Sequence, residues 1–317
     1  MGAWVNFTNH IEIANESWES GVIKYIGYKD INEDLFEEIV NDRMIKRIQI
    51  HEPLQTEAFY LIDKMLSRRP DMYFRIYALY WVETFDLSVL REMKNLKNLW
   101  IDASLKGKTG MLDCNILPDL KGLKVLDLSL FDLRDYSFLQ NMSEDMEKLS
   151  ISADTTGGSI NFDCKWLLRY SRLNTLYLGN KAKKNIEEIR NLPELRNLTI
   201  RGIKLKSFAF FRERNLESLA IHFCGMQDLS SLRDFHSLKH LELWRIMKLE
   251  DISFISTLLG LESLSLQDLK HITSLPDMSR LVNLNDIKLY NVPVKLEEVP
   301  EHLRSMMHRY DGTSFYD

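Results

Sequence analysis

The chain has 317 residues, of which 45% are hydrophobic and 27% are charged, and its formal net charge is -5 at pH 7. This composition is typical of an ordered globular protein and excludes a long disordered chain. It also argues against nucleic acid or an anionic membrane as the main partner, because both attract strongly basic proteins.

Residues 1–20 alternate apolar and polar side chains in two short stretches. Alternation of this kind predicts β-strands, and two strands so close together indicate a short β-hairpin. We therefore expect residues 1–20 to form an N-terminal cap, whose apolar positions are Val5, Phe7, Ile11 and Ile13. The first residues hold no basic stretch followed by an apolar core, so we expect no signal peptide.

From residue 21 onward, the pattern L-x-x-L-x-L returns twelve times, about every 23 residues. Clear copies are Leu96–Ile101, Leu123–Leu128, Leu173–Leu178, Leu195–Ile200, Leu216–Ile221, Leu238–Leu243 and Leu261–Leu266. Close variants are Met146–Ile151 and Leu284–Leu289, and weaker copies begin at Ile23, at Ile45 and near Phe74, the last with its register open. A repeat of this period predicts stacked units that share a curved parallel sheet with a long concave face.

The segments that return the chain from one strand to the next also resemble one another. Three of them share the pattern D-x-S-x-[LI], in Asp135–Leu139, Asp228–Leu232 and Asp251–Ile255. Asp or Ser at such a position can cap a short helical turn whose apolar residues face the core. One longer helix is predicted over Glu57–Leu66, because its apolar residues recur on one side.

Units of about 22 residues with this return resemble the internalin-type class of bacterial leucine-rich repeat proteins. The resemblance covers roughly residues 22–300 and implies an α/β solenoid. In such an arc, a parallel inner β-sheet faces a convex side of short helices, 3₁₀ turns and loops. The expected organisation is thus the cap of residues 1–20, a solenoid of about twelve units over residues 21–300, and a C-terminal cap over residues 301–317.

The chain departs from the family at the position three residues after the last strand leucine. Many family members carry Asn there, and a ladder of these side chains forms hydrogen bonds. In this chain the position is apolar, so we expect no such ladder, and we interpret Cys224 as a small buried filler. The residues at this position are Ile203, Cys224, Ile246, Leu269 and Val292.

Two repeats are longer than the others, because extra residues occur at Lys106–Asn115 and Asp154–Asp163. Insertions in a repeat protein fall in loops and often frame a binding face. Neutral drift of loop length is the other interpretation, and the sequence leaves both open.

Two motifs suggest chemistry but are incomplete. Gly107-Lys108-Thr109 resembles the end of a phosphate-binding loop, but the first glycine of such a loop falls at Asp102, whose carboxylate would repel phosphate. His236 and His240 are four residues apart, yet the register places the first before a strand and the second on it, and nothing completes a zinc site. We therefore expect no catalytic residue, no cofactor and no metal.

The concave face supplies the candidate binding residues. Outward strand positions in the later repeats carry Tyr177, Arg201, His222, Glu242, Trp244, Lys288 and Tyr290, and those in the earlier repeats carry His51, Tyr80, Trp100, Asp102 and Asp127. Trp, Tyr and Arg are the residues most enriched at binding hot spots. We predict that a partner contacts Tyr177, Arg201, His222, Trp244, Tyr290 and Trp100. The alternative is that these rings shield neighbouring strand residues or pack on loops. We expect Trp244 to be an exposed ring that points away from the core, so its removal should leave the melting temperature almost unchanged.

These observations favour a non-enzymatic module that recognises a protein through its concave face and acts as a monomer. Three scattered cysteines and the lack of a long apolar run suit a cytoplasmic protein, so a bacterial cytosolic binding, immunity or regulatory protein is expected. A translocated effector that binds host proteins fits the same features. A cryptic enzyme or nucleotide-binding protein is a further alternative, and Asp102 counts against it.

Overall fold

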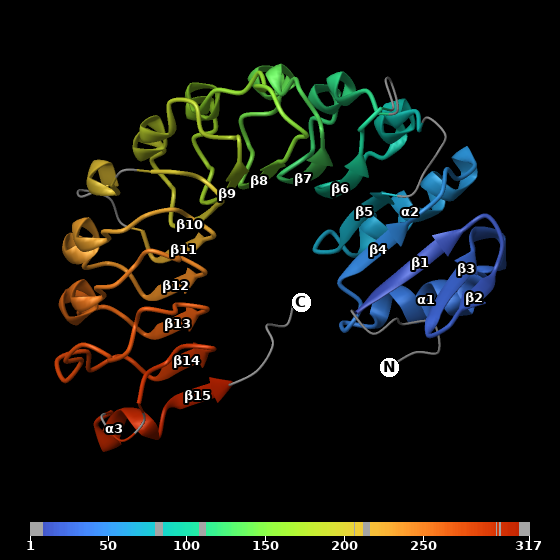
Figure 1. Cartoon of the computed structure of the whole chain (residues 1–317). Coiled ribbons are helices and arrows are strands. Elements are labelled where there is room, and N and C mark those ends of the chain that lie inside the picture. Colours follow the sequence, from blue (N-terminus) through green and yellow to red (C-terminus); the bar gives the residue numbers. More distant parts are fainter. Residues whose placement is uncertain are drawn as a thin grey trace. The chain divides into compact units, whose positions relative to one another are not determined.

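A computed structural model describes residues 9–79, 85–107, 112–205, 207–211, 216–295, 297 and 299–310. The chain divides into two compact units. Unit 1 comprises residues 1–162 and 169–172, and unit 2 comprises residues 163–168 and 173–317. In both units, strands alternate with short returning segments (Figure 1).

The sheet of unit 1 has the strand order β8-β7-β6-β5-β4-β1-β3-β2. Its strands are β1 (His10–Ala14), β2 (Trp18–Ser20), β3 (Ile23–Gly27), β4 (Arg47–Ile50), β5 (Tyr73–Ala78), β6 (Asn98–Ser104), β7 (Val125–Phe131) and β8 (Lys148–Ala153). The returns hold the helices α1 (Glu33–Asn41) and α2 (Thr56–Arg68) and the 3₁₀ helices η1 (Tyr28–Asp30), η2 (Leu87–Glu92), η3 (Cys114–Asp119) and η4 (Ser137–Asn141).

The sheet of unit 2 has the strand order β15-β14-β13-β12-β11-β10-β9. Its strands are β9 (Thr175–Asn180), β10 (Asn197–Arg201), β11 (Ser218–His222), β12 (His240–Trp244), β13 (Ser263–Gln267), β14 (Asp286–Tyr290) and β15 (Met307–Tyr310). The helices of its returns are η6 (Ile186–Asn191), η7 (Ala209–Phe211), η8 (Ser230–Asp234), η9 (Ser253–Thr257) and α3 (Glu301–Arg304), and η5 (Cys164–Arg169) lies at the boundary between the units.

Each of the twelve predicted repeat copies contains one strand, from β3 to β14, which confirms the predicted repeat. Along these strands, buried aliphatic residues alternate with partly exposed ones, as in Leu198 and Ile200 of β10. The apolar position that replaces the Asn ladder is buried in every unit named above, and its residues are at most 2% exposed. A row of buried apolar side chains thus takes the place of an Asn ladder, as predicted.

The repeat around Phe74 has a register that the sequence left open. Phe74 pairs with Leu99, and Ile76 pairs with Ile101. Phe74 is therefore the second apolar position of its repeat and not the first, so the residues that face away from the core are Arg75 and Tyr77. Tyr80, which the sequence placed on this face, lies outside the described residues.

The N-terminal strands pair differently from a simple hairpin within residues 1–20. β1 lies between β3 and β4 and pairs in parallel with both. The antiparallel hairpin in the described residues is formed by β2 and β3, with Gly21 at φ +60° in the turn. Val5 and Phe7 of the predicted hairpin lie outside the described residues, as do residues 311–317 of the predicted C-terminal cap. β15 extends the sheet by pairing in parallel with β14.

The predicted caps of the returning segments are present. The carboxylates of Asp135, Asp228 and Asp251 accept hydrogen bonds at 2.7 to 2.9 Å from the backbone N–H two residues later. Each of these aspartates precedes a 3₁₀ helix, so the carboxylate satisfies a donor at the helix start that has no partner within the helix. The predicted helix over Glu57–Leu66 is α2, whose buried side is made up of Ala58, Phe59, Ile62, Met65 and Leu66.

The second inserted loop, Asp154–Asp163, folds against the preceding repeat. Asp132 accepts hydrogen bonds from the backbone N–H and the hydroxyl of Thr156, both at 3.2 Å. Asn161 donates to Asp135 at 2.9 Å. These contacts connect the loop to the return of the repeat before it. Part of the first insertion, residues 108–111, lies outside the described residues.

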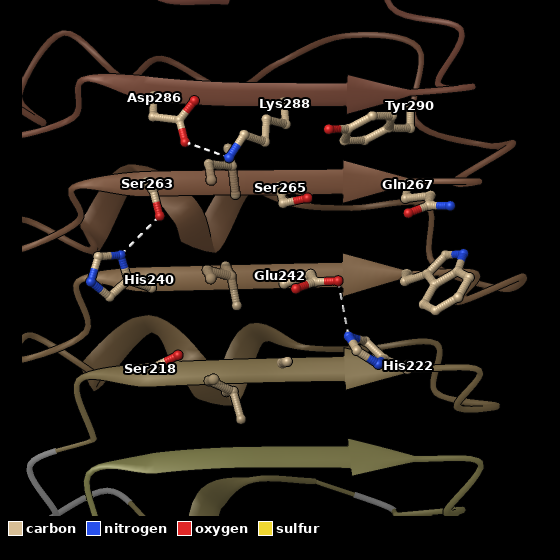
Figure 2. Close-up of a pocket in the computed structure, with 15 residues that line it drawn as sticks. Ser218, His222, His240, Glu242, Ser263, Ser265, Gln267, Asp286, Lys288 and Tyr290 are labelled. Carbon is tan, nitrogen blue, oxygen red and sulfur yellow. Dashed lines mark hydrogen bonds and ion pairs between the residues drawn. The ribbon is translucent and has the colours of Figure 1, made fainter. Parts of the chain in front are cut away.

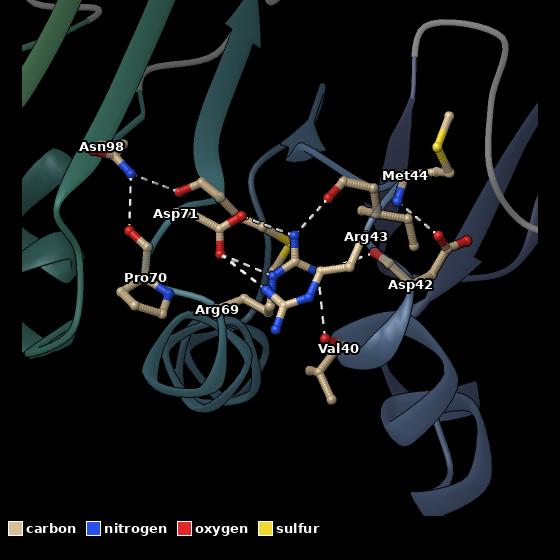
Figure 3. A network of polar contacts seen from close by, with 10 residues as sticks. Val40, Asp42, Arg43, Met44, Arg69, Pro70, Asp71 and Asn98 are labelled. Carbon is tan, nitrogen blue, oxygen red and sulfur yellow. Dashed lines mark hydrogen bonds and ion pairs between the residues drawn. The ribbon is translucent and has the colours of Figure 1, made fainter.

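A buried arginine joins the two longest helices of unit 1 (Figure 3). Arg69 follows α2 and is 1% exposed. Its guanidinium donates five hydrogen bonds of 2.9 to 3.3 Å, two to the carboxylate of Asp71 and one each to the backbone carbonyls of Val40, Asp42 and Ile45. All five N–H groups of the side chain are thus used, and they satisfy carbonyls in the segment that connects α1 to β4.

We predict that Arg69→Met lowers the free energy of unfolding by about 3 to 5 kcal/mol, because it leaves three carbonyls and a carboxylate without their donor. Urea denaturation followed by circular dichroism measures the change. The neighbouring Arg68→Met is the matched control, since Arg68 pairs with Glu37 at an exposed site and should contribute less than about 1 kcal/mol. Equal effects of the two variants would contradict this assignment.

Candidate functional site

The face of each sheet that points away from the core is called the open face here. In unit 2 the strands pair in register, so the open-face side chains form three rows across β9 to β14. The first row is Thr175, Asn197, Ser218, His240, Ser263 and Asp286; the second is Tyr177, Thr199, Ala220, Glu242, Ser265 and Lys288; the third is Gly179, Arg201, His222, Trp244, Gln267 and Tyr290.

A hollow of about 460 Å³ lies on this face over β11 to β14 (Figure 2). It forms because the small side chains of Ser218, Ala220, Ser263 and Ser265 alternate there with larger ones. The larger side chains surround it on both sides. They are His222, His240, Glu242, Trp244, Gln267, Asp286, Lys288 and Tyr290.

Polar contacts hold the side chains around the hollow in place. His222 Nε2 lies 3.1 Å from the carboxylate of Glu242, and Lys288 Nζ lies 2.9 Å from that of Asp286. The His222 contact lowers the pKa of Glu242, although burial acts in the opposite direction. Glu242 is therefore a carboxylate near neutral pH. The hollow presents both charges and hydroxyl groups, so it suits a polar or charged group better than an apolar one.

Trp244 differs from its predicted state. It lies on the open face as predicted, but it is only 7% exposed. Its indole N–H donates to the carboxylate of Asp268 at 3.0 Å, and its ring packs against the rings of Phe223 and His222 at centroid distances of 4.5 and 5.3 Å. The expectation that Trp244 is an exposed ring is therefore wrong, because neighbouring side chains cover it, and the effect of its removal on stability remains to be measured.

Asp268 fixes the position of Trp244. It is 3% exposed, and it also accepts a hydrogen bond from Asn291 at 2.9 Å and pairs with Arg245 at 3.2 Å. Burial raises its pKa, but the bonds from Asn291 and Trp244 and the charge of Arg245 together lower it below the ordinary value. Asp268 thus stays ionised and binds three donors at once.

We predict that Trp244→Ala lowers the free energy of unfolding by about 2 to 4 kcal/mol, because the ring is buried and its loss removes one donor from Asp268. Gln267→Ala is the control, since Gln267 is the next residue in the same row and is partly exposed. Its effect should stay below about 1 kcal/mol. Chemical denaturation of both variants measures the difference, and a Trp244→Ala protein as stable as the wild type would restore the original expectation.

The other predicted binding residues of unit 2 are distributed over two rows. Arg201, His222, Trp244 and Tyr290 share the third row, and Tyr177 lies in the second. Arg201, His222, Tyr177 and Tyr290 are all partly exposed. Trp100, the sixth predicted residue, lies in unit 1.

The open face of unit 1 holds a row of side chains in which sequence reasoning named Trp100 and Asp127 but missed Glu12, Gln49 and Arg75. The ring of Trp100 lies under two guanidinium groups, with Arg75 at 3.8 Å and Arg47 at 5.2 Å from its centroid. Arg75 donates to Asp102 at 2.5 Å and to Gln49 at 3.0 Å. The open register near Phe74 concealed Arg75. Alternation of buried and outward positions, once aligned to Leu99, identifies it.

Further along the chain, Gln49 connects this row to another acid. Its amide donates to Glu12 at 2.5 Å, and Glu12 lies 3.1 Å from His10 Nε2 and 3.8 Å from His51 Nδ1. Glu12 is 3% exposed, and burial raises its pKa, yet the contacts with His10 and His51 lower it overall. Most charged side chains in this row therefore have a polar or oppositely charged group next to them.

Asp127 is the exception in this row, because no cation in the described residues forms an ion pair with it. It pairs in register with Trp100 on one side and Ser150 on the other. Its pKa is raised to about 6, chiefly by burial and also by the charge of the nearby Asp102, although Ser150 and Arg75 act in the opposite direction.

The folded state therefore binds a proton at Asp127 more tightly than the unfolded chain does. Its contribution should make the free energy of unfolding fall as pH rises from about 4 to about 6, and the loss should persist above that range. We predict that Asp127→Asn stabilises the protein at pH 7 by about 1 to 3 kcal/mol and has little effect at pH 4.

Denaturation midpoints measured between pH 4 and pH 8 test this. Asp145→Asn is the control, since Asp145 pairs with Arg172 at an exposed site. It should give a small change without this pH dependence. A destabilised Asp127→Asn protein at pH 7 would show that the carboxylate is favourably bound.

The comparisons with known proteins address the fold. No family model and no curated protein matches the chain. Among solved structures, an internalin (InlF) of Listeria monocytogenes has a TM-score of 0.51 at 21% identity, over 84% of this chain and 78% of that chain. The chain has an internalin-like leucine-rich repeat fold.

Two further solved structures share the repeat type at lower similarity. Internalin C2 of Listeria monocytogenes has a TM-score of 0.45 at 18% identity, over 64% of this chain and 83% of that chain. A leucine-rich repeat protein of Leptospira interrogans has a TM-score of 0.42 at 16% identity, over 87% and 80% of the two chains.

The structure describes part of the incomplete phosphate-loop motif and both histidines of the incomplete zinc motif. Asp102 is 7% exposed and is bound by Arg75, while Lys108 and Thr109 of the phosphate-loop motif lie outside the described residues. His236 precedes β12 and His240 begins it, as predicted. The described ranges contain no group of three His, Cys, Asp or Glu residues that could hold a metal, and no helix in them is long and apolar enough to cross a membrane.

The three cysteines are buried and free. Burial raises the pKa of each thiol above its ordinary value. Cys224 is 2% exposed and donates weakly to the carbonyl of His222 at 3.3 Å. A thiol with a raised pKa is a poor nucleophile. These data confirm the interpretation of Cys224 as a small core residue.

Proposed function

We propose that the open face of unit 2 recognises a protein partner and that the chain acts as a non-enzymatic binding module. The observation that carries this proposal is the hollow of about 460 Å³ over β11 to β14. A sheet face gains nothing in folding from a hollow lined by charged and aromatic side chains, whereas an inserted group of a partner would bury them.

Within this proposal, the partner contacts Tyr177, Arg201, His222 and Tyr290 directly. Trp244 acts behind them, since it is covered by its neighbours and orients His222 and Arg201. Trp100 in unit 1 is proposed as a second contact, because two guanidinium groups lie over its ring and hold it in place. The rows bring four of the six residues onto one line across the sheet, which suits a partner segment that crosses the strands.

The proposed setting is a bacterial cytosolic binding, immunity or regulatory protein. The internalin-like fold supports a bacterial origin, and the three free buried thiols suit a reducing compartment. No cofactor enters this proposal, because binding requires only the side chains already described.

We predict that Ser265→Arg weakens binding of the partner at least about tenfold. Ser265 lies at the bottom of the hollow, so the longer side chain fills the space that a partner group would occupy. Because Ser265 points away from the core, the thermal melt should change little. Affinity capture from the source organism followed by mass spectrometry identifies the partner, and calorimetry then compares the two proteins.

Ser274→Arg is the matched control, since Ser274 is exposed on the return after β13. It makes the same chemical change away from the open face and should leave affinity intact. Equal affinities for the wild type, Ser265→Arg and Ser274→Arg would place the partner elsewhere and contradict the proposal.

A further inference from the structure

Arg201 is held in an unusual way for an arginine at a partly exposed site. Its guanidinium carbon lies 4.2 Å from the ring centroid of Phe223 and 5.3 Å from that of Trp244. In the part of the chain that the structure describes, no carboxylate forms an ion pair with it and no group accepts a hydrogen bond from it. Two aromatic rings therefore orient a planar group whose five N–H donors remain available.

The neighbours of Arg201 in the third row leave space for a ligand. On one side, Arg201 pairs with Gly179 of β9, which has no side chain. On the other side, it pairs with His222, which contacts Glu242. The guanidinium lies over the rings of Phe223 and Trp244, and Gly179 leaves the β9 side of Arg201 without a neighbouring side chain in this row. Among the three open-face rows, the carboxylate nearest to Arg201 is that of Glu242. This carboxylate already pairs with His222.

Phe223 lies in a backbone conformation that disfavours a bulky residue. At the end of each strand from β9 to β14, one residue has φ between +50° and +64°. The residues at this position are Asn180, Gly202, Phe223, Arg245, Asp268 and Asn291. Gly, Asn and Asp adopt this left-handed conformation most readily, whereas Phe does so at a cost. Phe223 therefore contributes something other than an easy turn, namely the ring under Arg201.

The same edge of the sheet is strongly basic. In the four residues after the end of β9, β10 and β12, the sequence has cations and no carboxylate, and the four residues after β11 are uncharged. These cations are Lys181, Lys183, Lys184, Lys204, Arg245 and Lys248. Lys184 and Arg245 pair with Asp163 and Asp268, while Lys183, Lys204 and Lys248 are exposed. Because parallel strands end at one edge, these charges are gathered beside Arg201.

We propose that this edge, the carboxyl ends of β9 to β12, binds an acidic segment of the partner protein, with the guanidinium of Arg201 holding an Asp or Glu carboxylate. The inference rests on the proposed function and names the chemistry of its partner. A carboxylate matches the guanidinium because two parallel N–H···O bonds can form between them. The aromatic rings hold the guanidinium in one plane, which reduces the entropy lost on binding.

A protein carboxylate fits this surface better than the phosphate backbone of a nucleic acid. The second row carries Glu242, whose side chain is 42% exposed, and the first row carries Asp286. A continuous polyanion that crosses the strands would meet both carboxylates. An acidic peptide segment can place its few charges at the basic edge and uncharged residues over the rest of the face.

The test uses fluorescence anisotropy with the full chain and four labelled probes. They are a peptide of alternating Glu and Gly, the same peptide with Gln or with Lys in place of Glu, and an oligothymidylate of similar length. We expect the Glu peptide to bind most tightly and salt to weaken it, since exposed charges are screened. Tighter binding of the oligothymidylate or of the Lys peptide would overturn the proposal.

Variants connect the binding to Arg201. Arg201→Gln should weaken the Glu peptide about tenfold, and Arg201→Lys should weaken it less, because an ammonium keeps the charge but not the planar fork. Arg91→Gln is the matched control, since Arg91 is an exposed arginine of unit 1 that pairs with Asp119. Equal losses in Arg201→Gln and Arg91→Gln would reduce the effect to net charge and overturn the proposal.

Phe223→Asn separates binding from folding. Asn already occupies this position at the ends of β9 and β14, and its ease in the left-handed conformation offsets part of the packing lost against Trp244, so most of the thermal stability should be retained. The Glu peptide should nonetheless bind less tightly, because Arg201 loses the ring beneath it. Unchanged affinity in Phe223→Asn, with the melt retained, would show that the ring does not orient the arginine for this ligand.

The outcomes distinguish this inference from the function on which it rests. If Ser265→Arg abolishes binding of the captured partner while Arg201→Gln and the Glu peptide have no effect, the open face is the binding site and the acidic-segment inference is wrong. If the Glu peptide binds through Arg201 while Ser265→Arg leaves the captured partner bound, the site for acidic segments stands and the proposed role of the hollow falls.

Discussion

In-register pairing between parallel strands is the interaction on which the rest of this structure depends. Within each unit, equivalent residues of successive repeats lie beside one another, as Leu198, Leu219 and Leu241 do along β10 to β12. The inward residues therefore form continuous apolar layers, and each repeat buries its edge only against its neighbours. A register shift of one residue would turn every one of these side chains to the wrong face.

The same pairing imposes an electrostatic problem on the open faces. Charges at equivalent positions of adjacent strands lie close together, so each repeat must accommodate the charges of the next. In unit 1, acidic side chains alternate with side chains that donate hydrogen bonds to them. Hydrogen bonds of 2.5 to 3.0 Å link Glu12, Gln49, Arg75 and Asp102. Asp127 lies at the end of this arrangement without its own cation, and burial together with the charge of Asp102 raises its pKa. In unit 2, small side chains separate the charges and leave the hollow.

Much of the fold follows from residue spacing alone. The L-x-x-L-x-L pattern identified all twelve strands from β3 to β14, because burial of alternate residues is a local property of each strand. The capping aspartates were equally predictable, since Asp228 binds a backbone N–H only two residues away. The helix α1 was missed, although Asn32 caps it and Phe36, Ile39 and Val40 form its buried side. The parallel insertion of β1 between β3 and β4 was also missed, because strand order depends on contacts between residues distant in the sequence.

The site was less predictable for a related reason. Spacing showed which residues face outward but not which of them are covered by their neighbours. Trp244 is buried because Phe223, in the turn of the preceding repeat, and Asp268, from the next repeat, close over it. Arg201 was recognised only as a residue type common in interfaces. Its lack of an ion pair and its two aromatic contacts are properties of three strands together, which no single repeat encodes.

The residue in the left-handed conformation at the end of each strand from β9 to β14 affects how such a protein can diversify. This position lies outside the apolar layers, so its side chain can vary from Asn180 to Phe223 to Arg245 while the repeat keeps its path. Selection can therefore change the side chains along this edge of the sheet one repeat at a time, at the cost of a mildly strained turn. A repeat protein with this geometry can acquire a new specificity by exchanging turn residues, without any compensating change in its interior.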